Sequence, residues 1–161
     1  MLYKEIGRNI LIIDKYFKIY LKTSLKYHGL NTAEGMVLLT LYEQTGQTSE
    51  QVLQNIHHKN FSTTQNQLIE DLHYDKGVMT RTIQSLEQKG FVQRADNPLD
   101  SRSFLLNVTN KALEMKPVLI NILKRWNDFI LLGFDETALD MLNQSLITMA
   151  ENAADALKEG F

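Results

Sequence analysis

Apolar side chains recur at helical spacing near the N-terminus. Steps of four and three residues join one stripe, made of Ile6, Ile10, Ile13, Phe17, Tyr20 and Ser24. This periodicity predicts a long helix over residues 3–27 that Gly29 terminates. Further apolar residues give the helix a second apolar side, so we expect it to be covered on more than one face. A second helix is predicted from Thr32 to just before Gly46, and the polar segment 46–63 has room for one short helix.

The centre of the chain predicts short elements in quick succession. A capped helix is expected over 64–72, and after a turn a further helix follows over 76–88 and ends at Gly90. Beyond it the apolar period changes from helical to alternating. An Asn-Pro-Leu-Asp turn joins two candidate strands, 91–94 and 104–108, into the only β element that the pattern predicts.

Two long helices are predicted to close the chain. The first spans 110–131 and contains Pro117, which either kinks the helix or marks its true first turn. The second begins after Asp135, a good N-cap, and carries a heptad seam. The seam consists of Leu139, Leu142, Leu146, Met149, Ala153 and Ala156. We interpret the seam as a dimer contact, and the alternative is an ordinary amphipathic helix that packs on its own core.

Composition places the chain among ordinary globular proteins. Of its 161 residues, 43% are hydrophobic and 22% are charged, which suits one domain with a sizeable core rather than a disordered chain. The sequence contains no cysteine, which excludes disulfides, thiolate metal sites and thiol chemistry. Since no apolar run could span a membrane and the N-terminus lacks a signal-peptide pattern, we expect a cytoplasmic protein.

Charge is distributed unevenly, although the net charge is only −2. Segments 31–75 and 135–161 are acidic, whereas 1–30, 76–109 and 110–134 carry a basic excess. A DNA-binding surface needs local positive charge, because phosphate neutralisation supplies most of the non-specific affinity. Only a compact patch within 76–109 has the position and charge for that task.

Residues 64–109 combine two short helices and a hairpin, which is the order of a winged helix-turn-helix. In the second helix, Met79, Ile83 and Leu86 share the inward face. The opposite face carries Gly77, Arg81, Gln84 and Gln88, with Thr80 at its edge and Lys76 in the first turn. Because Arg can pair with guanine and Gln with adenine, this face suits the major groove. A merely solvated polar face is the alternative.

Arg94 and Arg102 flank the turn of the predicted hairpin. An Arg near the tip of such a wing can contact phosphates or a narrow minor groove. We expect Asp100 to hold Arg102 by a charge-assisted hydrogen bond and so to orient the wing. A plain surface salt bridge is the alternative.

Several short motifs follow one another in this region. They are Thr64-Gln65-x-x-Leu68, Met79-Thr80-Arg81-x-Ile83-x-x-Leu86-Glu87-x-Lys89-Gly90-Phe91-Val92-x-Arg94, Pro98-x-Asp100-x-Arg102 and Val108-Thr109. In this order they resemble the winged-helix core of the MarR family of bacterial transcription regulators. The resemblance covers about residues 64–112 closely, and the flanking long helices match in order and length.

The resemblance implies a mainly α fold with a small β-hairpin, in which long terminal helices flank a winged helix-turn-helix. Residues 1–161 then form a single MarR-like chain, with a DNA-binding region over 32–109 and a helical dimerisation region over 1–30 and 110–161. It also implies a homodimeric repressor that binds a pseudo-palindromic double-stranded operator. Many family members release DNA when they bind a small aromatic or phenolic ligand.

We expect DNA contacts from both the second helix and the wing. The helix at 76–88 enters the major groove and Arg102 touches the minor groove, as the resemblance implies. Arg81 and Gln84 are expected to discriminate bases. Mainly phosphate contacts are expected of Thr64, Lys76, Thr80 and Arg94. The full predicted set is Thr64, Gln65, Lys76, Gly77, Thr80, Arg81, Gln84, Arg94, Asn97 and Arg102, with Asp100 orienting the wing.

Three departures from the family pattern bear on these expectations. Ala112 stands where the family often has Gly, and Ser101 stands where it often has a second basic residue. With Asp96 near its tip the wing is less basic than usual, so we expect DNA affinity to be modest or strongly salt-sensitive. The segment 46–63 is longer than the family's usual connection.

The sequence gives little support for a catalytic, cofactor or metal site. It contains no phosphate-binding Gly loop, nucleophile elbow or His-Glu-x-x-His motif, so we expect neither an enzyme nor a cofactor. Adjacent histidines diverge by about 100° on a helix, which speaks against a shared metal. We therefore interpret His28, His57, His58 and His73 as surface residues. The aromatic residues that are weak candidates to line a ligand cavity are Tyr16, Tyr20, Tyr27 and Trp126. The alternative is that they belong to the hydrophobic core.

Two functional hypotheses follow from the sequence. The first is a DNA-binding regulator. The second is a winged-helix protein-interaction module that does not bind DNA, and the weak net charge, the acidic segment 31–75 and Asp96 support it. Salt-titrated binding to DNA upstream of the chain's own gene separates them, because only the regulator binds and loses affinity steeply with salt.

Overall fold

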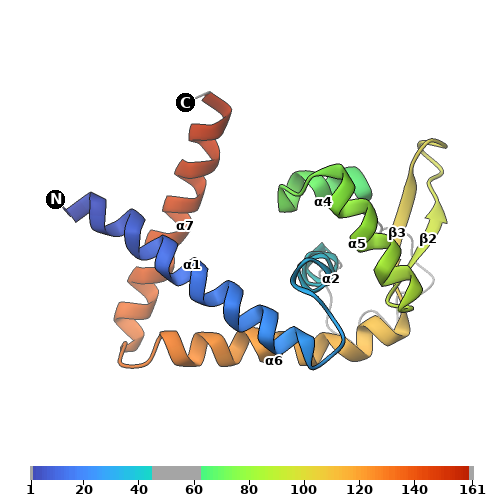
Figure 1. The fold of residues 1–161 in the computed structure, drawn as a ribbon. Helices are drawn as coiled ribbons and strands as arrows, with labels where there is room; N and C mark the ends of the chain where they lie inside the picture. Colours follow the sequence, from blue (N-terminus) through green and yellow to red (C-terminus); the bar gives the residue numbers. More distant parts are fainter. Residues whose placement is uncertain (1, 45–62, 160–161) are drawn as a thin grey trace. The chain divides into compact units, whose positions relative to one another are not determined.

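The computed structural model describes residues 2–44 and 63–159 of the chain. Among these residues it contains six helices and three short strands, in the order α1, α2, β1, α4, α5, β2, β3, α6, α7 (Figure 1). They form two compact units, residues 1–123 and residues 124–161. The mainly helical fold expected from the sequence is confirmed. The short helix expected in 46–63 falls, apart from residue 63, outside the described residues.

Helices α1 (Leu2–Lys26) and α2 (Thr32–Gln44) are those expected from the periodicity, within about two residues. The last turns of α1 bury Leu25, which packs directly on Gly35 of α2. A Cβ at Gly35 would lie 2.5 Å from Leu25 Cδ1, so the two helices meet where α2 has no side chain. Between the helices Gly29 has a φ of +71°, which terminates α1 as predicted.

The first unit then forms a helix-turn-helix from α4 (Gln65–Leu72) and α5 (Lys76–Gln88). His73 closes α4 in the left-handed region, with a φ of 51°. Asp75 begins α5, and its Oδ1 accepts a hydrogen bond of 2.8 Å from the backbone N–H of Val78. Both helices therefore begin and end at local signals that are independent of the rest of the fold.

The sheet is larger than the hairpin predicted from the sequence. β2 (Val92–Asp96) and β3 (Phe104–Val108) form the expected antiparallel pair, with Val92 opposite Val108. A third strand, β1 (Thr63–Thr64), pairs antiparallel with the other edge of β3, so the order is β1-β3-β2. The prediction of a single β element was incomplete, because two residues are too few to show an alternating pattern.

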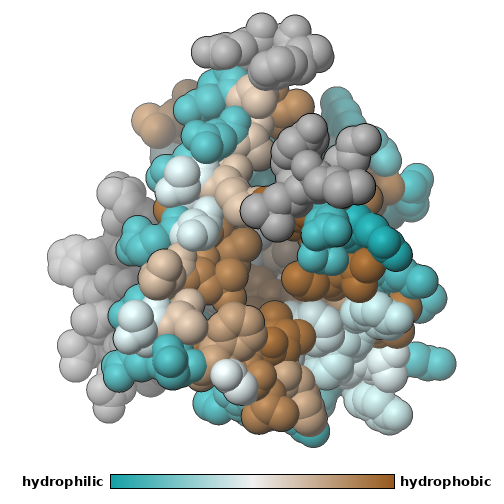
Figure 2. Space-filling model, turned by 90° about the vertical axis from the view of Figure 1, so that its left-hand side faces the viewer, coloured by the Kyte–Doolittle hydropathy of each residue, from teal (hydrophilic) through white to brown (hydrophobic). Residues whose placement is uncertain are grey.

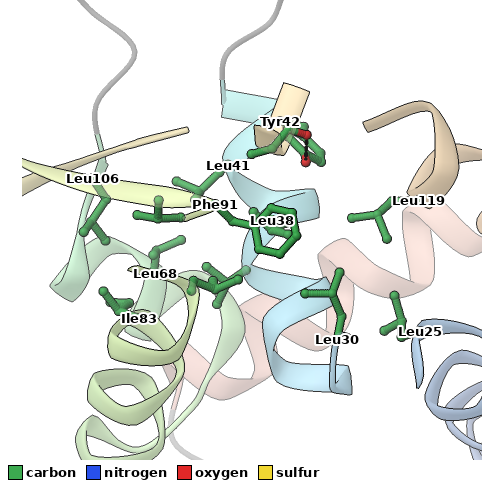
Figure 3. Close-up of a cluster of buried hydrophobic side chains, with 14 of the residues drawn as sticks. Leu25, Leu30, Leu38, Leu41, Tyr42, Leu68, Ile83, Phe91, Leu106 and Leu119 are labelled. Carbon is green, nitrogen blue, oxygen red and sulfur yellow. Dashed lines mark hydrogen bonds between the residues drawn. The ribbon is translucent and has the colours of Figure 1, made fainter. Parts of the chain in front are cut away.

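Helices α1, α2, α4, α5 and α6 and strands β2 and β3 all contribute to one hydrophobic core in the first unit (Figure 3). Helix α2 buries apolar residues on several sides and lies at the centre of the core, where Val37 and Leu38 are fully buried. Leu68 of α4, Ile83 of α5 and Leu106 of β3 pack from the winged-helix side (Figure 3). Because the inward face of α5 is buried here, its opposite face is fixed toward solvent.

Helix α6 (Asn110–Ile130) continues straight on from β3 in the sequence and runs through Pro117. Thr109 Oγ1 accepts a hydrogen bond of 3.3 Å from the backbone N–H of Ala112 and so caps the helix eight residues before the proline. Of the two alternatives for Pro117, the first turn of the helix is therefore wrong. Within this unit the α6 backbone also accepts a hydrogen bond of 2.9 Å from the Tyr20 hydroxyl, at the Ile122 carbonyl.

In the second unit, helix α7 (Glu136–Glu159) follows the N-cap predicted at Asp135, whose Oδ1 accepts a hydrogen bond of 2.8 Å from the backbone N–H of Ala138. Along the heptad seam Leu139 and Leu142 are half-buried, whereas Leu146 is 50% exposed. The seam is thus partly open to solvent in the single chain.

Hydrophobic side chains also reach the surface of the single chain (Figure 2). On α1 the large exposed ones are Ile6, Ile10, Leu11, Ile12, Ile13, Tyr16 and Ile19. On α7 they are Met141, Leu146, Ile147, Met149 and Leu157. Contiguous apolar surface of this kind ordinarily marks an interaction site in a globular protein.

Candidate nucleic-acid interface

The entry to α4 is held by a capping box. Gln67 donates its backbone N–H to Thr64 Oγ1 at 3.3 Å, and the Thr64 backbone N–H donates to Gln67 Oε1 at 2.8 Å. The Thr64 hydroxyl also lies 3.2 Å from Gln67 Oε1, to which it donates. The side chain of Thr64 therefore stabilises the helix start, and its hydroxyl proton is already used inside the protein.

One side-chain hydrogen bond joins the two helices of the motif. Gln65 donates from Nε2 to Thr80 Oγ1 at 2.8 Å, and the Thr80 hydroxyl in turn donates to the carbonyl of Lys76 at 2.7 Å. Sequence reasoning placed both residues among the DNA contacts. The structure gives them internal bonds that fix α4 against the first turns of α5.

The outward face of α5 is exposed as the periodicity predicted. Gly77, Arg81, Gln84 and Gln88 are exposed, while Met79, Ile83 and Leu86 are completely buried. Arg81 lies back along the helix, because a Cβ built on Gly77 would be 3.6 Å from Arg81 Nη1. Neither Arg81 nor Lys76 forms an ion pair with any residue in the described ranges. This end of α5 therefore presents guanidinium, ammonium and amide donors to solvent.

The other end of α5 is anchored by a buried polar network that sequence reasoning missed. Glu34 of α2 is fully buried, and its carboxylate accepts hydrogen bonds from Lys89 Nζ at 2.7 Å and from Ser85 Oγ at 2.6 Å. Glu34 also caps its own helix, where it accepts a 2.7 Å bond from the backbone N–H of Asn31. Lys89 donates further to the carbonyl of Gly29 at 2.8 Å.

Two opposing effects set the pKa of Glu34. Burial alone would raise the pKa of this carboxyl, but hydrogen bonds from Lys89, Ser85 and Asn31, together with the positive charge of Lys89, hold it below its usual value. Glu34 is thus ionised in the folded chain. The network joins α2, the α1–α2 turn and the end of α5, so it fixes the axis along which the exposed face lies.

Arg94 on the wing is held from two sides. Its Nε lies 3.0 Å from Glu87 Oε1, at the end of α5, and its guanidinium lies 5.6 Å from the centre of the Phe104 ring on β3. Both side chains of the ion pair are about one third exposed. Strand β2 lies beside α5 (Figure 1), and the ion pair with Glu87 fixes the position of Arg94 relative to that helix.

The tip of the wing is built from local hydrogen bonds. Asp100 Oδ1 accepts from the Arg102 backbone N–H at 3.0 Å and from Arg102 Nε at 3.3 Å, so the pair expected from the sequence is present. These bonds hold the pKa of the Asp100 carboxyl below its usual value. Asn97, a predicted DNA contact, is half-buried and donates from Nδ2 to Ser103 Oγ at 2.8 Å. The Arg102 side chain remains 91% exposed.

A cleft of about 240 Å³ lies where the two helices and the wing meet. It is lined by Thr64, Gln65, Asn66, Lys76, Arg94, Arg102, Ser103, Phe104 and Leu106. Three positive charges from three different elements face it: Lys76 from α5, Arg94 from β2 and Arg102 from the wing turn. Such a cleft attracts a chain of phosphates, whose charge it meets with several separate donors.

The remaining candidate residues lie elsewhere. Tyr16 and Tyr27 are exposed on and after α1, whereas Tyr20 is half-buried and hydrogen-bonded to α6. Trp126, in the second unit, is half-buried. His28 and His73 are exposed, and the pair at 57–58 lies outside the described residues. Among the residues that the structure describes, no group of three or more His, Asp or Glu side chains could hold a metal ion.

No helix in the described part of the chain has the length and apolar character needed to cross a lipid bilayer.

The chain was compared with known families, proteins and structures. The MarR family model matches residues 30–104. HTH-type transcriptional regulator BilQ of Clostridioides difficile (strain CD3) is 30% identical over 144 residues, which cover 89% of this chain and 86% of that protein. Among solved structures, a MarR transcriptional regulator from Methanosarcina mazei Go1 is 25% identical, with a TM-score of 0.79 over 95% of this chain and 99% of that one.

Proteins of similar fold have also been solved together with DNA. A putative MarR family transcriptional regulator from Listeria monocytogenes, complexed with a 26mer DNA, is 24% identical to the chain and has a TM-score of 0.74. The match covers 95% of this chain and 93% of that one. At this level of identity the similarity shows that the two share a fold.

Proposed function

The chain belongs to the MarR family, and on that premise we propose that it is a non-enzymatic transcription regulator that binds a specific double-stranded DNA sequence. One observation carries the proposal. The outward face of α5 presents Arg81 and Gln84 to solvent, and Arg81 forms no ion pair in the described chain. Beside this face lies a cleft lined by three positively charged side chains. The DNA complex of the Listeria monocytogenes relative is consistent with this role.

Base discrimination is assigned to the exposed face of α5. Arg81 can donate two parallel hydrogen bonds to guanine, and Gln84, one turn further along, can pair with adenine. Gly77 has no side chain at the point where the helix approaches the duplex most closely. These three residues lie on one face, so they meet the edges of neighbouring base pairs.

Phosphate contacts are assigned to the cleft beside that face. Lys76 and Arg94 line it and hold their charges toward a passing DNA backbone. Arg102 extends from the wing toward the minor groove, with Asp100 fixing its orientation. Thr64, Gln65, Thr80 and Asn97 support the contact mainly by holding the cleft together, because their side chains bond within the protein.

We further propose that the protein acts as a homodimer on a pseudo-palindromic operator in the cytoplasm. The apolar side chains exposed on α1 and on α7 support a dimerisation region over 1–30 and 110–161, with residues 32–109 binding DNA. Two-fold symmetry then places the two α5 helices roughly 34 Å apart, one turn of the duplex.

Repression and its relief by a small aromatic or phenolic ligand complete the proposal. Tyr16, Tyr20, Tyr27 and Trp126 are the aromatic residues assigned to that ligand. A thermal-shift screen with simple phenols checks this assignment, because a ligand that binds the folded state raises the unfolding temperature. A shift that persists after Tyr16→Ala and Tyr27→Ala would reject those two residues.

A salt-titrated binding assay tests the DNA-binding proposal. The probe is the duplex upstream of the chain's own gene, with a shuffled duplex of equal length as control. If Lys76 and Arg94 at phosphates and Arg102 in the minor groove each displace one counterion in both subunits, log affinity falls against log salt with a slope of about −5. Lys76→Met should reduce that slope by about 2, since a dimer loses two contacts. Absence of any binding at low salt would favour a protein-interaction module instead.

A further inference from the structure

The acidic residue Glu87 forms an ion pair with Arg94, which lines the cleft proposed to bind phosphates, and a negative charge there should oppose phosphate binding. It occupies the last turn of α5, and its Oε1 lies 3.0 Å from Arg94 Nε. We propose that Glu87 is a positioning residue, which orients Arg94 so that removing this acid weakens DNA binding rather than strengthening it. The inference rests on the proposed DNA-binding function and adds a determinant of affinity to it.

The geometry around Arg94 supports a positioning role. Arg94 stands opposite Leu106 in the β2–β3 register, so Phe104, two residues from Leu106, is its diagonal neighbour on the same sheet face. The guanidinium is thus bounded by the Phe104 ring at 5.6 Å and by the Glu87 carboxylate at 3.0 Å. A long flexible side chain is held by two different elements, and less of its freedom remains to be lost when it binds a phosphate.

The contact leaves the binding end of Arg94 available. The closest approach of the ion pair is between Glu87 Oε1 and Nε, and the two terminal nitrogens of the guanidinium carry four of its five N–H groups. Arg94 also lines the cleft together with Lys76 and Arg102. A guanidinium whose ion pair lies on the Nε side can present its two terminal nitrogens side by side, which is the arrangement that binds two oxygens of one phosphate.

Glu87 also links the wing to α5 through its ion pair with Arg94. Lys89, two residues further on, is fixed by Glu34, so the end of α5 is a rigid base for the Glu87 carboxylate. The position of Arg94 relative to Arg81 is then determined by the fold rather than by the DNA. This is the preorganisation that a phosphate contact needs if it is to set the register of the base-reading face.

A second acid provides the matched control. Asp96 follows Arg94 by two residues on β2 and is exposed, and it forms no ion pair with any residue that the structure describes. Removing its charge should therefore act only through long-range repulsion of phosphate. Asp96→Asn is expected to tighten binding about twofold at low salt, whereas Glu87→Gln, which removes the same charge, is expected to weaken it about fivefold.

The experiment measures affinity of the full chain by fluorescence anisotropy, with the duplex upstream of its own gene as probe and a shuffled duplex beside it. Variants are Glu87→Gln, Asp96→Asn, Arg94→Ala and the double variant Glu87→Gln/Arg94→Ala. If Glu87 acts through Arg94, Glu87→Gln weakens binding in the wild-type background and has no weakening effect once Arg94 is Ala. The Glu87→Gln variant should also show a shallower salt dependence, because one phosphate contact per subunit is poorly formed.

Each other outcome overturns the inference. Equal binding by Glu87→Gln means that Glu87 does not position Arg94 for DNA, and tighter binding means that only its negative charge matters. An equal loss in the Arg94→Ala background means that Glu87 serves the fold alone. If Glu87→Gln lowers the unfolding temperature, Arg94→Lys provides the alternative test, because it keeps the positive charge but lacks the planar guanidinium. Binding as tight as that of the wild type by Arg94→Lys contradicts the proposal. If the wild-type chain binds no duplex, the proposed function itself fails, which is a distinct result.

Discussion

The two ends of helix α5 use charged residues in opposite ways. At its end, Lys89 bonds to the buried carboxylate of Glu34 at 2.7 Å and to a backbone carbonyl. At its start, Lys76 and Arg81 form no ion pair within the described chain, and Arg81 is exposed. One end of the helix is therefore fixed to the protein core, and the other is left free to bind something else.

This contrast distinguishes charged residues that the fold needs from charged residues that are available to bind a ligand. A charge beside a buried partner is needed by the fold, because loss of either partner leaves the other uncompensated in an apolar surrounding. An exposed charge without a partner contributes little to stability. Under the proposed function such a charge binds DNA, so mutations at the two ends should separate stability from DNA affinity.

The largest expected effect comes from breaking the anchored end. Lys89→Met leaves the Glu34 carboxylate buried and without its cation, so the free energy of unfolding should fall by about 3 kcal/mol. Urea denaturation followed by circular dichroism measures it. Lys76→Met is the matched control at the other end and should change stability by less than about 0.5 kcal/mol while weakening DNA binding. Equal losses of stability in the two variants would contradict the comparison.

Acid should weaken the anchored end selectively. The folded chain holds the pKa of Glu34 below its ordinary value of 4.5, so the carboxyl binds a proton more readily in the unfolded state. The contribution of Glu34 is therefore fully present above pH 4.5 and is lost as pH falls through the folded pKa. Unfolding temperatures of the wild type and Glu34→Gln, measured from pH 7 to pH 3, should converge at the acid end. Parallel curves would show that the ionised carboxylate adds nothing.

A smaller effect is expected at the N-cap of the DNA-facing end. Asp75→Ala removes the bond to the Val78 backbone N–H and should lower the free energy of unfolding by about 1 kcal/mol. Asp75→Asn keeps an acceptor oxygen and should recover most of that loss, which thermal unfolding of the pair can measure. If the two variants are equally unstable, the cap is not the cause.

The smallest change in stability is expected at Gln84, which is exposed on the base-reading face. Gln84→Ala should leave the free energy of unfolding within about 0.5 kcal/mol of wild type, since it removes no buried contact. It should nevertheless reduce preference for the upstream duplex over a shuffled one. Unchanged preference in a competition assay would remove Gln84 from the base-reading set.

Local sequence signals predicted most of the fold. The helix expected over 76–88 is present as α5 (Lys76–Gln88), because both its inward apolar stripe and its end at Gly90 depend only on residues close together in the sequence. Strand β1 (Thr63–Thr64) was missed, since pairing with β3 depends on a partner some forty residues away. For Pro117 the pattern left two alternatives, and only the cap at Thr109 decides between them.

The candidate site was predicted in part. Exposure of Arg81 and Gln84 followed from helical periodicity, and the Asp100–Arg102 pair followed from their spacing. The bond between Glu34 and Lys89 joins residues 55 positions apart, and no local pattern indicates it. Thr64 and Thr80 were expected at phosphates, yet their hydroxyls bond inside the protein, because a polar residue type does not reveal which partner lies nearest.

The central claim is that the exposed face of α5 reads base pairs. The most direct measurement compares wild type and Arg81→Ala on the upstream duplex and on a shuffled duplex at one salt concentration. The account predicts a loss of roughly 1–3 kcal/mol on the upstream duplex and little change on the shuffled one. An equal loss on both duplexes would mean that Arg81 contacts only phosphate, and it would contradict base reading by this face.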